Sequence, residues 1–370
     1  MVAAGRGSDR DDRLSLSSPG TYVRAETGAG SRNSLEKNSP MGRLADALAA
    51  GRILLADGAT GTNLFDMGLQ AGDAPELWNR DFPDRVRTLH RAFVDAGADI
   101  VLTNTFGANA RRLKLHDAEG DVAALNEAAI ALARREADAA ERTVLVAGSV
   151  GPTGDLLEPL GPLTTRDAEE VFTEQMKAIA DAGADAIWIE TMSAPNEMRA
   201  ALSAAEKTGL DTVLTASFDT AGRTMMGLSP RDLPEIGSLG AVAVGANCGV
   251  GASDLLAAIL DIEVDHPPFI VAKANCGVPV VRGDEVVYTG TPATMAEYVR
   301  LAVDAGASII GGCCGTTPDH LVHMRRALDE HQRSERPTLP EIAERTGAFV
   351  NSVGATDERG RTRRRGRRSR

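Results

Sequence analysis

Hydrophobic positions between residues 53 and 315 fall into eight short, β-branched runs, and segments with apolar residues at helical spacing separate most of them. The segment 78–98, for example, places Val86, Leu89 and Phe93 on one side of a helix. The runs predict eight buried strands, within residues 53–60, 99–109, 143–154, 186–197, 212–220, 241–251, 269–277 and 308–315.

A short sequence repeat supports a repeating strand–helix unit. DAGAD at 95–99 and 181–185, and DAGAS at 304–308, each close a helix and lead directly into a strand, and the glycine stands where a left-handed helix C-cap is expected. Eight parallel strands with intervening helices match a (β/α)₈ TIM barrel in count and size. A doubly wound open sheet is the alternative, but it usually has fewer strands and a glycine-rich first turn.

Composition suggests three parts. Residues 1–43 are rich in Ser, Gly, Arg and Asp and are expected to form a disordered extension. The barrel is expected over residues 44–332, and residues 333–370 are expected to hold a short helix followed by a disordered arginine-rich tail.

The charge of the chain argues against a nucleic-acid enzyme. The formal net charge is −12, and setting aside eight arginines among the last twelve residues leaves a body of about −20. The chain has four cysteines without a secreted-type framework, no signal-peptide core and no apolar run of membrane-spanning length. We therefore expect a cytoplasmic protein that acts on small molecules, not on membranes or nucleic acids.

Polar and thiol side chains gather at the ends of the predicted strands, whereas the strand interiors are apolar. In a barrel these ends meet on one face, where such enzymes keep their chemistry. The predicted active site therefore draws on Asp57, Asn104, Ser149, Glu190, Ser217, Asp219, Asn247, Cys248, Asn275, Cys276, Cys313 and Cys314.

The cysteines suggest a specific chemistry. Adjacent Cys313 and Cys314 cannot easily bond to each other, because that disulfide closes a strained ring, but they can bind one soft metal ion. With Cys248 they would give zinc three thiolates and leave one tetrahedral position open, as in catalytic sites. Such an electron-rich ion is suited to holding a fourth thiolate as a nucleophile for S-alkylation.

The blocks DGATGT, NTFGAN, GPTG, IET, GANCG and GGCCGTTP resemble the homocysteine S-methyltransferase family, from about residue 44 to 330. The resemblance implies a barrel with one zinc ion bound by Cys248, Cys313 and Cys314, and homocysteine as the methyl acceptor that becomes methionine. It also implies that Asp57, Gly58 and Glu190 hold the amino-acid end, with Asn104 as a further contact. Cys276 and Asn247 are expected beside the metal, not bound to it.

Among family members, the chain most resembles bacterial proteins described as betaine–homocysteine methyltransferases. Aromatic faces should hold a quaternary ammonium donor, and Trp78 stands where the animal betaine enzymes place a tryptophan. Gly107 and Thr191 stand where those enzymes have tyrosines, so the candidates to complete the cage are Phe65, Phe106 and Phe218. Glycine betaine, giving dimethylglycine, is the first expectation for the donor; S-methylmethionine, or a methylcorrinoid on a partner protein, is the alternative.

Two readings from other classes stay open. Glu190 and Asp57 could act as acid and base in a barrel aldolase or hydrolase, and the four cysteines could form a closed structural zinc site in a non-catalytic module. Histidines are expected at the surface or in packing positions, not in the chemistry, and this applies to His90, His116, His266, His320 and His323.

Overall fold

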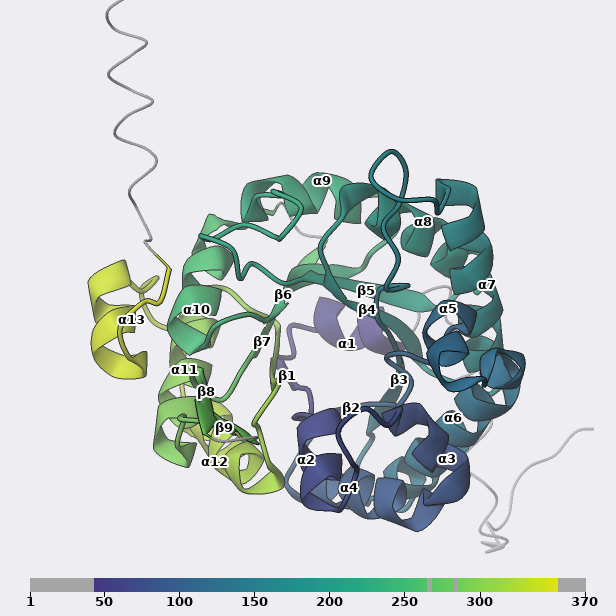
Figure 1. The fold of residues 1–370 in the computed structure, drawn as a ribbon. Helices are drawn as coiled ribbons and strands as arrows, with labels where there is room; N and C mark the ends of the chain where they lie inside the picture. The colour runs from purple at the N-terminus through teal and green to yellow at the C-terminus, as the bar shows by residue number, and fades with distance from the viewer. Residues whose placement is uncertain (1–42, 265–267, 283–284, 352–370) are drawn as a thin grey trace, which may run out of the picture. The chain divides into compact units, whose positions relative to one another are not determined.

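Eight parallel strands form the centre of the computed structural model, which describes residues 43–264, 268–282 and 285–351 (Figure 1). Their order is β1-β10-β7-β6-β5-β4-β3-β2, and a parallel bridge between Ala56 and Ile100 brings β1 beside β2, so the sheet closes into a barrel. The predicted (β/α)₈ barrel is confirmed. The strands are β1 (Leu54–Leu55), β2 (Ile100–Leu102), β3 (Leu145–Val150), β4 (Ala186–Met192), β5 (Asp211–Ala216), β6 (Ala243–Cys248), β7 (Phe269–Ala274) and β10 (Ile309–Gly312).

Most helices form a ring outside these strands (Figure 1). The α-helices are α1 (Arg43–Ala49), α2 (Gly61–Asp66), α3 (Trp78–Asp81), α4 (Pro83–Asp95), α5 (Ala110–Leu113), α6 (Val122–Asp138), α7 (Thr165–Asp181), α8 (Pro195–Glu206), α9 (Leu233–Gly237), α10 (Ala252–Asp261), α11 (Pro292–Asp304), α12 (Pro318–Glu330) and α13 (Leu339–Thr346). Short 3₁₀ turns are η1 (Pro75–Leu77), η2 (Lys114–His116), η3 (Glu119–Asp121) and η4 (Pro230–Asp232).

The repeated glycines end helices as predicted. Gly97, Gly183 and Gly306 follow α4, α7 and α11 with φ of +102°, +90° and +104°, a left-handed backbone that glycine adopts without a Cβ penalty. Each helix therefore ends sharply, and the chain turns directly into the next strand.

The barrel interior is a separate apolar cluster that α1 closes at one mouth. Leu44 and Leu48 of α1 are buried with strand residues such as Leu54, Ile100 and Trp188, and Figure 1 shows α1 in the middle of the ring of strands. This plug fills the end where the strands begin, so the opposite end, where the strands finish, is left for a site.

One element was not predicted. Between β7 and α11 the chain forms an antiparallel hairpin of β8 (Pro279–Arg282) and β9 (Glu285–Tyr288). Its sequence, β-branched residues on both sides of a Gly-Asp pair, is typical of a hairpin. The hairpin matters because it brings Tyr288 to the sulfur cluster described below.

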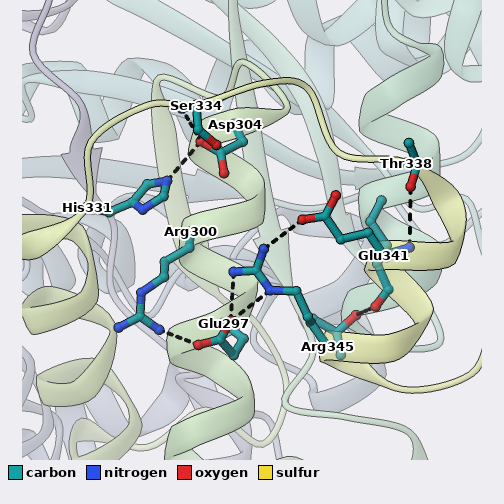
Figure 2. Close-up of polar contacts among 10 residues, drawn as sticks. Glu297, Arg300, Asp304, His331, Ser334, Thr338, Glu341 and Arg345 are labelled. Carbon is teal, nitrogen blue, oxygen red and sulfur yellow. Dashed lines mark hydrogen bonds and ion pairs between the residues drawn. The ribbon is translucent and has the colours of Figure 1, made fainter.

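After α12 the chain packs α13 against the barrel (Figure 2). The guanidinium of Arg345 donates to Oε2 of Glu297 in α11 at 2.7 and 2.9 Å and to Oε1 of Glu341 at 3.0 Å. Ile342 is fully buried in the main core between strands and helices. A short helix, expected in this region, is therefore held by both an ion pair and an apolar contact.

Expectations for the N-terminal extension to residue 42, for His266 and for the arginine-rich tail concern residues outside those described. Within the described ranges, no helix combines the length and the apolar character needed to cross a bilayer.

Candidate active site and metal centre

A cavity of about 420 Å³ opens at the C-terminal ends of the strands. We call one part of it the strand-end half, which comprises the 58–62 turn, Glu190, Thr191, Cys248, Lys273, Cys313 and Cys314. The loop half comprises Phe65, the 73–76 segment, Phe106, Gly107, Arg112 and His116. The face that carries the strand ends thus holds a cavity, as barrel geometry requires.

Three sulfurs meet in the strand-end half. Cys248 ends β6, Cys313 and Cys314 directly follow β10, and their Sγ atoms all lie within 4.8 Å of one another. The Sγ atoms of Cys248 and Cys314 are 3.9 Å apart. Zn–S bonds of about 2.3 Å at tetrahedral angles would separate the sulfurs by about 3.8 Å, so the cluster fits a soft metal ion with little movement. Cys276 is buried outside this cluster, and its backbone N–H donates to the carbonyl of Cys314 at 2.9 Å.

Asn247 holds the backbone next to the cluster. Cys248 and Thr191 both have positive φ, of 61° and 62°, which is uncommon for residues with a Cβ. The Asn247 side chain accepts from the Thr191 N–H at 2.8 Å and donates to its hydroxyl at 2.7 Å. Its Nδ2 also lies 3.9 Å from Sγ of Cys313. Asn247 therefore links the ends of β4 and β6 in the conformation that directs Cys248 toward the other two sulfurs.

The protonation of the cluster favours a cation among the sulfurs. Hydrogen bonds from Cys248 and from Cys313 lower the pKa of Cys314 to about 3. Hydrogen bonds with Cys313 and Cys314, together with burial, raise the pKa of Cys248. The pKa of Cys313 rises to about 11, because its hydrogen bond to Cys314 and its burial outweigh the lowering effect of Cys248. One thiolate forms easily, and three together require a compensating positive charge.

Two buried carboxylates, Asp57 and Glu190, and the buried Lys273 lie at the strand ends. Oδ2 of Asp57 accepts from the Leu102 N–H at 2.8 Å, whereas Oδ1 has no hydrogen bond within the described chain and lies 3.5 Å from Nζ of Lys273. Burial raises the pKa of Asp57 to about 6, against the attraction of Lys273. Burial also raises the pKa of Glu190, whose Oε1 accepts from the Ser149 hydroxyl at 2.5 Å. Glu190 and Lys273 line the cavity, and Asp57 lies directly before the Gly58 turn that also lines it.

The turn after β1 is tightly packed at its glycine. A Cβ on Gly58 would lie 2.6 Å from the carbonyl oxygen of Thr316 and 2.8 Å from the Phe93 ring. Asn104, expected as a substrate contact, lines the cavity and uses Nδ2 to hold the loop half by donating to the Pro75 carbonyl at 2.7 Å.

The expected aromatic cage is not assembled. Trp78 is 5% exposed and lies outside the cavity lining, with its ring 4.9 Å from both the Phe82 ring and the Arg85 guanidinium carbon. Trp78, the first residue of α3, instead belongs to the main hydrophobic core between strands and helices. Phe218 lines a different, small cavity, and only Phe65 and Phe106 reach the main one.

The histidines differ in position. His90 is buried in α4, where desolvation lowers its pKa to about 4, in keeping with a packing role. His116 lines the loop half of the cavity, so the expectation that it has only a surface or packing position does not describe it fully.

The sequence reasoning did not single out four residues of the site. They are Glu76, Arg112 and Lys273, which line the cavity, and Tyr288, which lies close enough to Cys314 to lower the pKa of its thiol. A lysine within the apolar run FIVAKAN was a usable signal, because a charged residue in a buried strand needs a partner. Glu76 lies in the short turn η1 and Arg112 in the short helix α5, and nothing local marks them as site residues.

A family match, two related sequences and a similar solved structure relate this chain to homocysteine methyltransferases and methionine synthases. The family described as Homocysteine S-methyltransferase matches residues 54–328. Methionine synthases of Mycobacterium leprae and Mycobacterium tuberculosis are 30% identical over 75% and 77% of this chain, which spans about a quarter of their length (24% and 25%). The metallated form of the homocysteine methyltransferase MmuM from Escherichia coli is similar in structure, with a TM-score of 0.63 and 25% identity over 78% of this chain and 99% of that one.

Proposed function

Because the chain belongs to the homocysteine S-methyltransferase family, we propose that it transfers a methyl group to the sulfur of homocysteine, using one zinc ion bound by Cys248, Cys313 and Cys314. The observation that carries the proposal is the meeting of three sulfurs within 4.8 Å of one another in a cavity that the buried carboxylate of Glu190 also lines. The metallated form of the related MmuM enzyme supports the metal.

The strand-end half suits the amino-acid end of homocysteine. Glu190, which lines the cavity, and Asp57, whose Oδ1 accepts no hydrogen bond within the described chain, are acceptors for the substrate ammonium. The backbone of the 58–62 turn supplies donors for its carboxylate. Lys273, which donates to the Gly58 carbonyl at 3.3 Å, holds this turn and balances the charge of the two acids. Fixing this end directs the substrate sulfur toward the cysteines.

The reaction needs no general base from the protein once the thiol has lost its proton. Zinc held by the three sulfurs would promote that loss and keep the substrate sulfur nucleophilic at neutral pH. An S–C bond then forms in line with cleavage of the methyl–heteroatom bond of the donor, and the electron pair of the broken bond stays on the leaving nitrogen or sulfur. With glycine betaine, the products are methionine and dimethylglycine.

Glycine betaine is the donor we propose first, on the resemblance of the sequence to bacterial betaine-type members. S-Methylmethionine and a methylcorrinoid carried by a partner protein are the alternatives. The matched methionine synthases are about four times longer than the aligned region, so their full set of substrates does not transfer to this chain.

A donor panel tests the proposal. Zinc-loaded protein with homocysteine is given betaine, S-methylmethionine, S-adenosylmethionine or methylcobalamin, and methionine is measured. X-ray absorption of the same protein should show three sulfur ligands and one light-atom ligand, with the light atom replaced by sulfur when homocysteine binds. A four-sulfur shell unchanged by homocysteine would instead indicate a structural zinc site and refute the proposal.

A further inference from the structure

The loop half of the cavity contains a carboxylate and a guanidinium that homocysteine binding does not use. Glu76 precedes α3 and Arg112 lies in α5, and both line the cavity with Phe65 and Phe106. We propose that these residues form a subsite for a small zwitterionic methyl donor, in which Glu76 faces the methylated onium group and Arg112 binds the donor carboxylate. This inference rests on the proposed function and specifies its second substrate.

Glu76 is built into the cavity wall. It is 6% exposed, and its Oε1 accepts from the Gly107 N–H at 2.6 Å. A buried carboxylate is costly to keep ionised unless hydrogen bonds or a cation compensate it. Burial raises the pKa of Glu76, and the nearby charges of Arg112 and His116 lower it without offsetting the burial. A donor bearing a methylated nitrogen or sulfur cation would add positive charge beside this carboxylate.

Gly107 shows how the two charged groups converge. A Cβ on Gly107 would lie 2.9 Å from Oε1 of Glu76 and 3.5 Å from Nε of Arg112. The absence of a side chain at residue 107 therefore leaves the space in which the carboxylate and the guanidinium approach each other. Recognition by charge takes the place of an aromatic cage here, because Phe65 and Phe106 are the only Phe, Tyr or Trp side chains among the described residues that line the cavity.

Arg112 has no carboxylate within 4.0 Å anywhere in the described ranges, unlike its neighbour Arg111, whose Nε is 2.6 Å from Asp155. Its guanidinium carbon lies 5.9 Å from the centre of the Phe106 ring, and its Cδ would be 3.0 Å from a Cβ on Gly154, so the side chain is packed in place. A guanidinium that is packed in the cavity near Glu76, but forms no ion pair within 4.0 Å among the described residues, can accept a planar carboxylate from a ligand.

The size of the cavity agrees with a small donor. About 420 Å³ accommodates homocysteine beside a small onium acid. An onium group held between Glu76 and the phenylalanine rings, with its carboxylate on Arg112, leaves its methyl groups free to face the strand-end half. Betaine and S-methylmethionine both have the required onium and carboxylate.

The test compares Arg112→Gln and Glu76→Gln with Arg111→Gln as the matched control, all as zinc-loaded full-length protein. Each is assayed with homocysteine and with glycine betaine, S-methylmethionine or glycine betaine methyl ester, which lacks the carboxylate. Arg112→Gln should raise KM for the two carboxylate donors by about 10-fold or more, as expected for loss of a charge-assisted hydrogen bond. It should change KM for the ester, KM for homocysteine and zinc content less than about twofold, and Glu76→Gln should raise KM for all three donors.

Several outcomes would overturn the inference. They are an equal effect of Arg112→Gln on ester and acid, an equal effect of Arg111→Gln, or a wild-type enzyme that accepts methylcobalamin but no onium donor. None of these outcomes would refute the proposed methylation of homocysteine. Failure of homocysteine to bind the metal in wild-type protein would refute the proposed function, and the inference with it.

Discussion

Replacing Lys273 with methionine should destabilise the protein, and the loss of stability should grow as the pH rises above about 6. The ammonium of Lys273 is almost completely buried 3.5 Å from Oδ1 of Asp57, and the side chain contributes its positive charge beside Glu190 as well. Methionine keeps most of the length and the apolar stem, so the substitution removes mainly the charge. Asp57 then remains buried without a cation.

Protonation of Asp57 limits the cost. Its pKa in the folded protein is already raised to about 6 from 3.8, and loss of Lys273 raises it further. The folded variant therefore holds a proton that the unfolded chain releases, so stability falls as pH rises. Relative to wild type, neutralising Asp57 costs about 1.4 kcal/mol for each pH unit above 6. The free energy of unfolding of the variant should be nearly equal to that of wild type at pH 6 and about 1.4 kcal/mol lower at pH 7. At higher pH the difference should level off at about 3–5 kcal/mol, the usual cost of breaking a buried ion pair.

Urea unfolding followed by circular dichroism at pH 6, 7, 8 and 9 measures this difference, with both proteins stripped of metal in the same way. The triple variant Lys273→Met, Asp57→Asn, Glu190→Gln is the control, because it removes both buried carboxylates that lie beside Lys273 and should lose the pH slope. A destabilisation by Lys273→Met that does not change with pH, or a slope that survives in the triple variant, would refute the reasoning.

Three further predictions concern the metal, the turn and the barrel plug. Cys314→Ser should reduce bound zinc to less than about a tenth of that in wild type at equal free zinc, measured by elemental analysis after dialysis, because a neutral hydroxyl is a poor replacement for a thiolate; full zinc occupancy would contradict this. Gly58→Ala should destabilise the protein by about 1–3 kcal/mol and raise KM for homocysteine, because the new Cβ would lie 2.6 Å from a backbone oxygen. Gly61→Ala is the control and should be tolerated, because no atom lies within 4 Å of the Cβ that it would add. Leu48→Ala should cost about 2–5 kcal/mol in urea unfolding without changing KM, because Leu48 closes the mouth of the barrel opposite the site; a large change in KM would show that the plug and the site are coupled.

The sequence alone was sufficient for the barrel and for the strand ends that carry the chemistry. The short β-branched runs and the helix-ending glycines reflect local backbone preferences. These preferences agree with the final fold at all eight strands and at Gly97, Gly183 and Gly306. The meeting of Cys248 with Cys313 and Cys314 could be anticipated because parallel strands in a barrel deliver their ends to one face.

Tertiary structure alone decided which side chains enter the cavity. Trp78 occupies the expected loop but turns into the core, whereas Glu76 and Arg112, far apart in the chain, converge beside Gly107. The pairing of Lys273 in β7 with Asp57 after β1, two strands away in the barrel, was equally unpredictable, although the lysine itself was visible in an apolar run. The physical reason is that periodicity records which face of an element is buried, whereas the direction of a loop side chain depends on packing against segments distant in sequence.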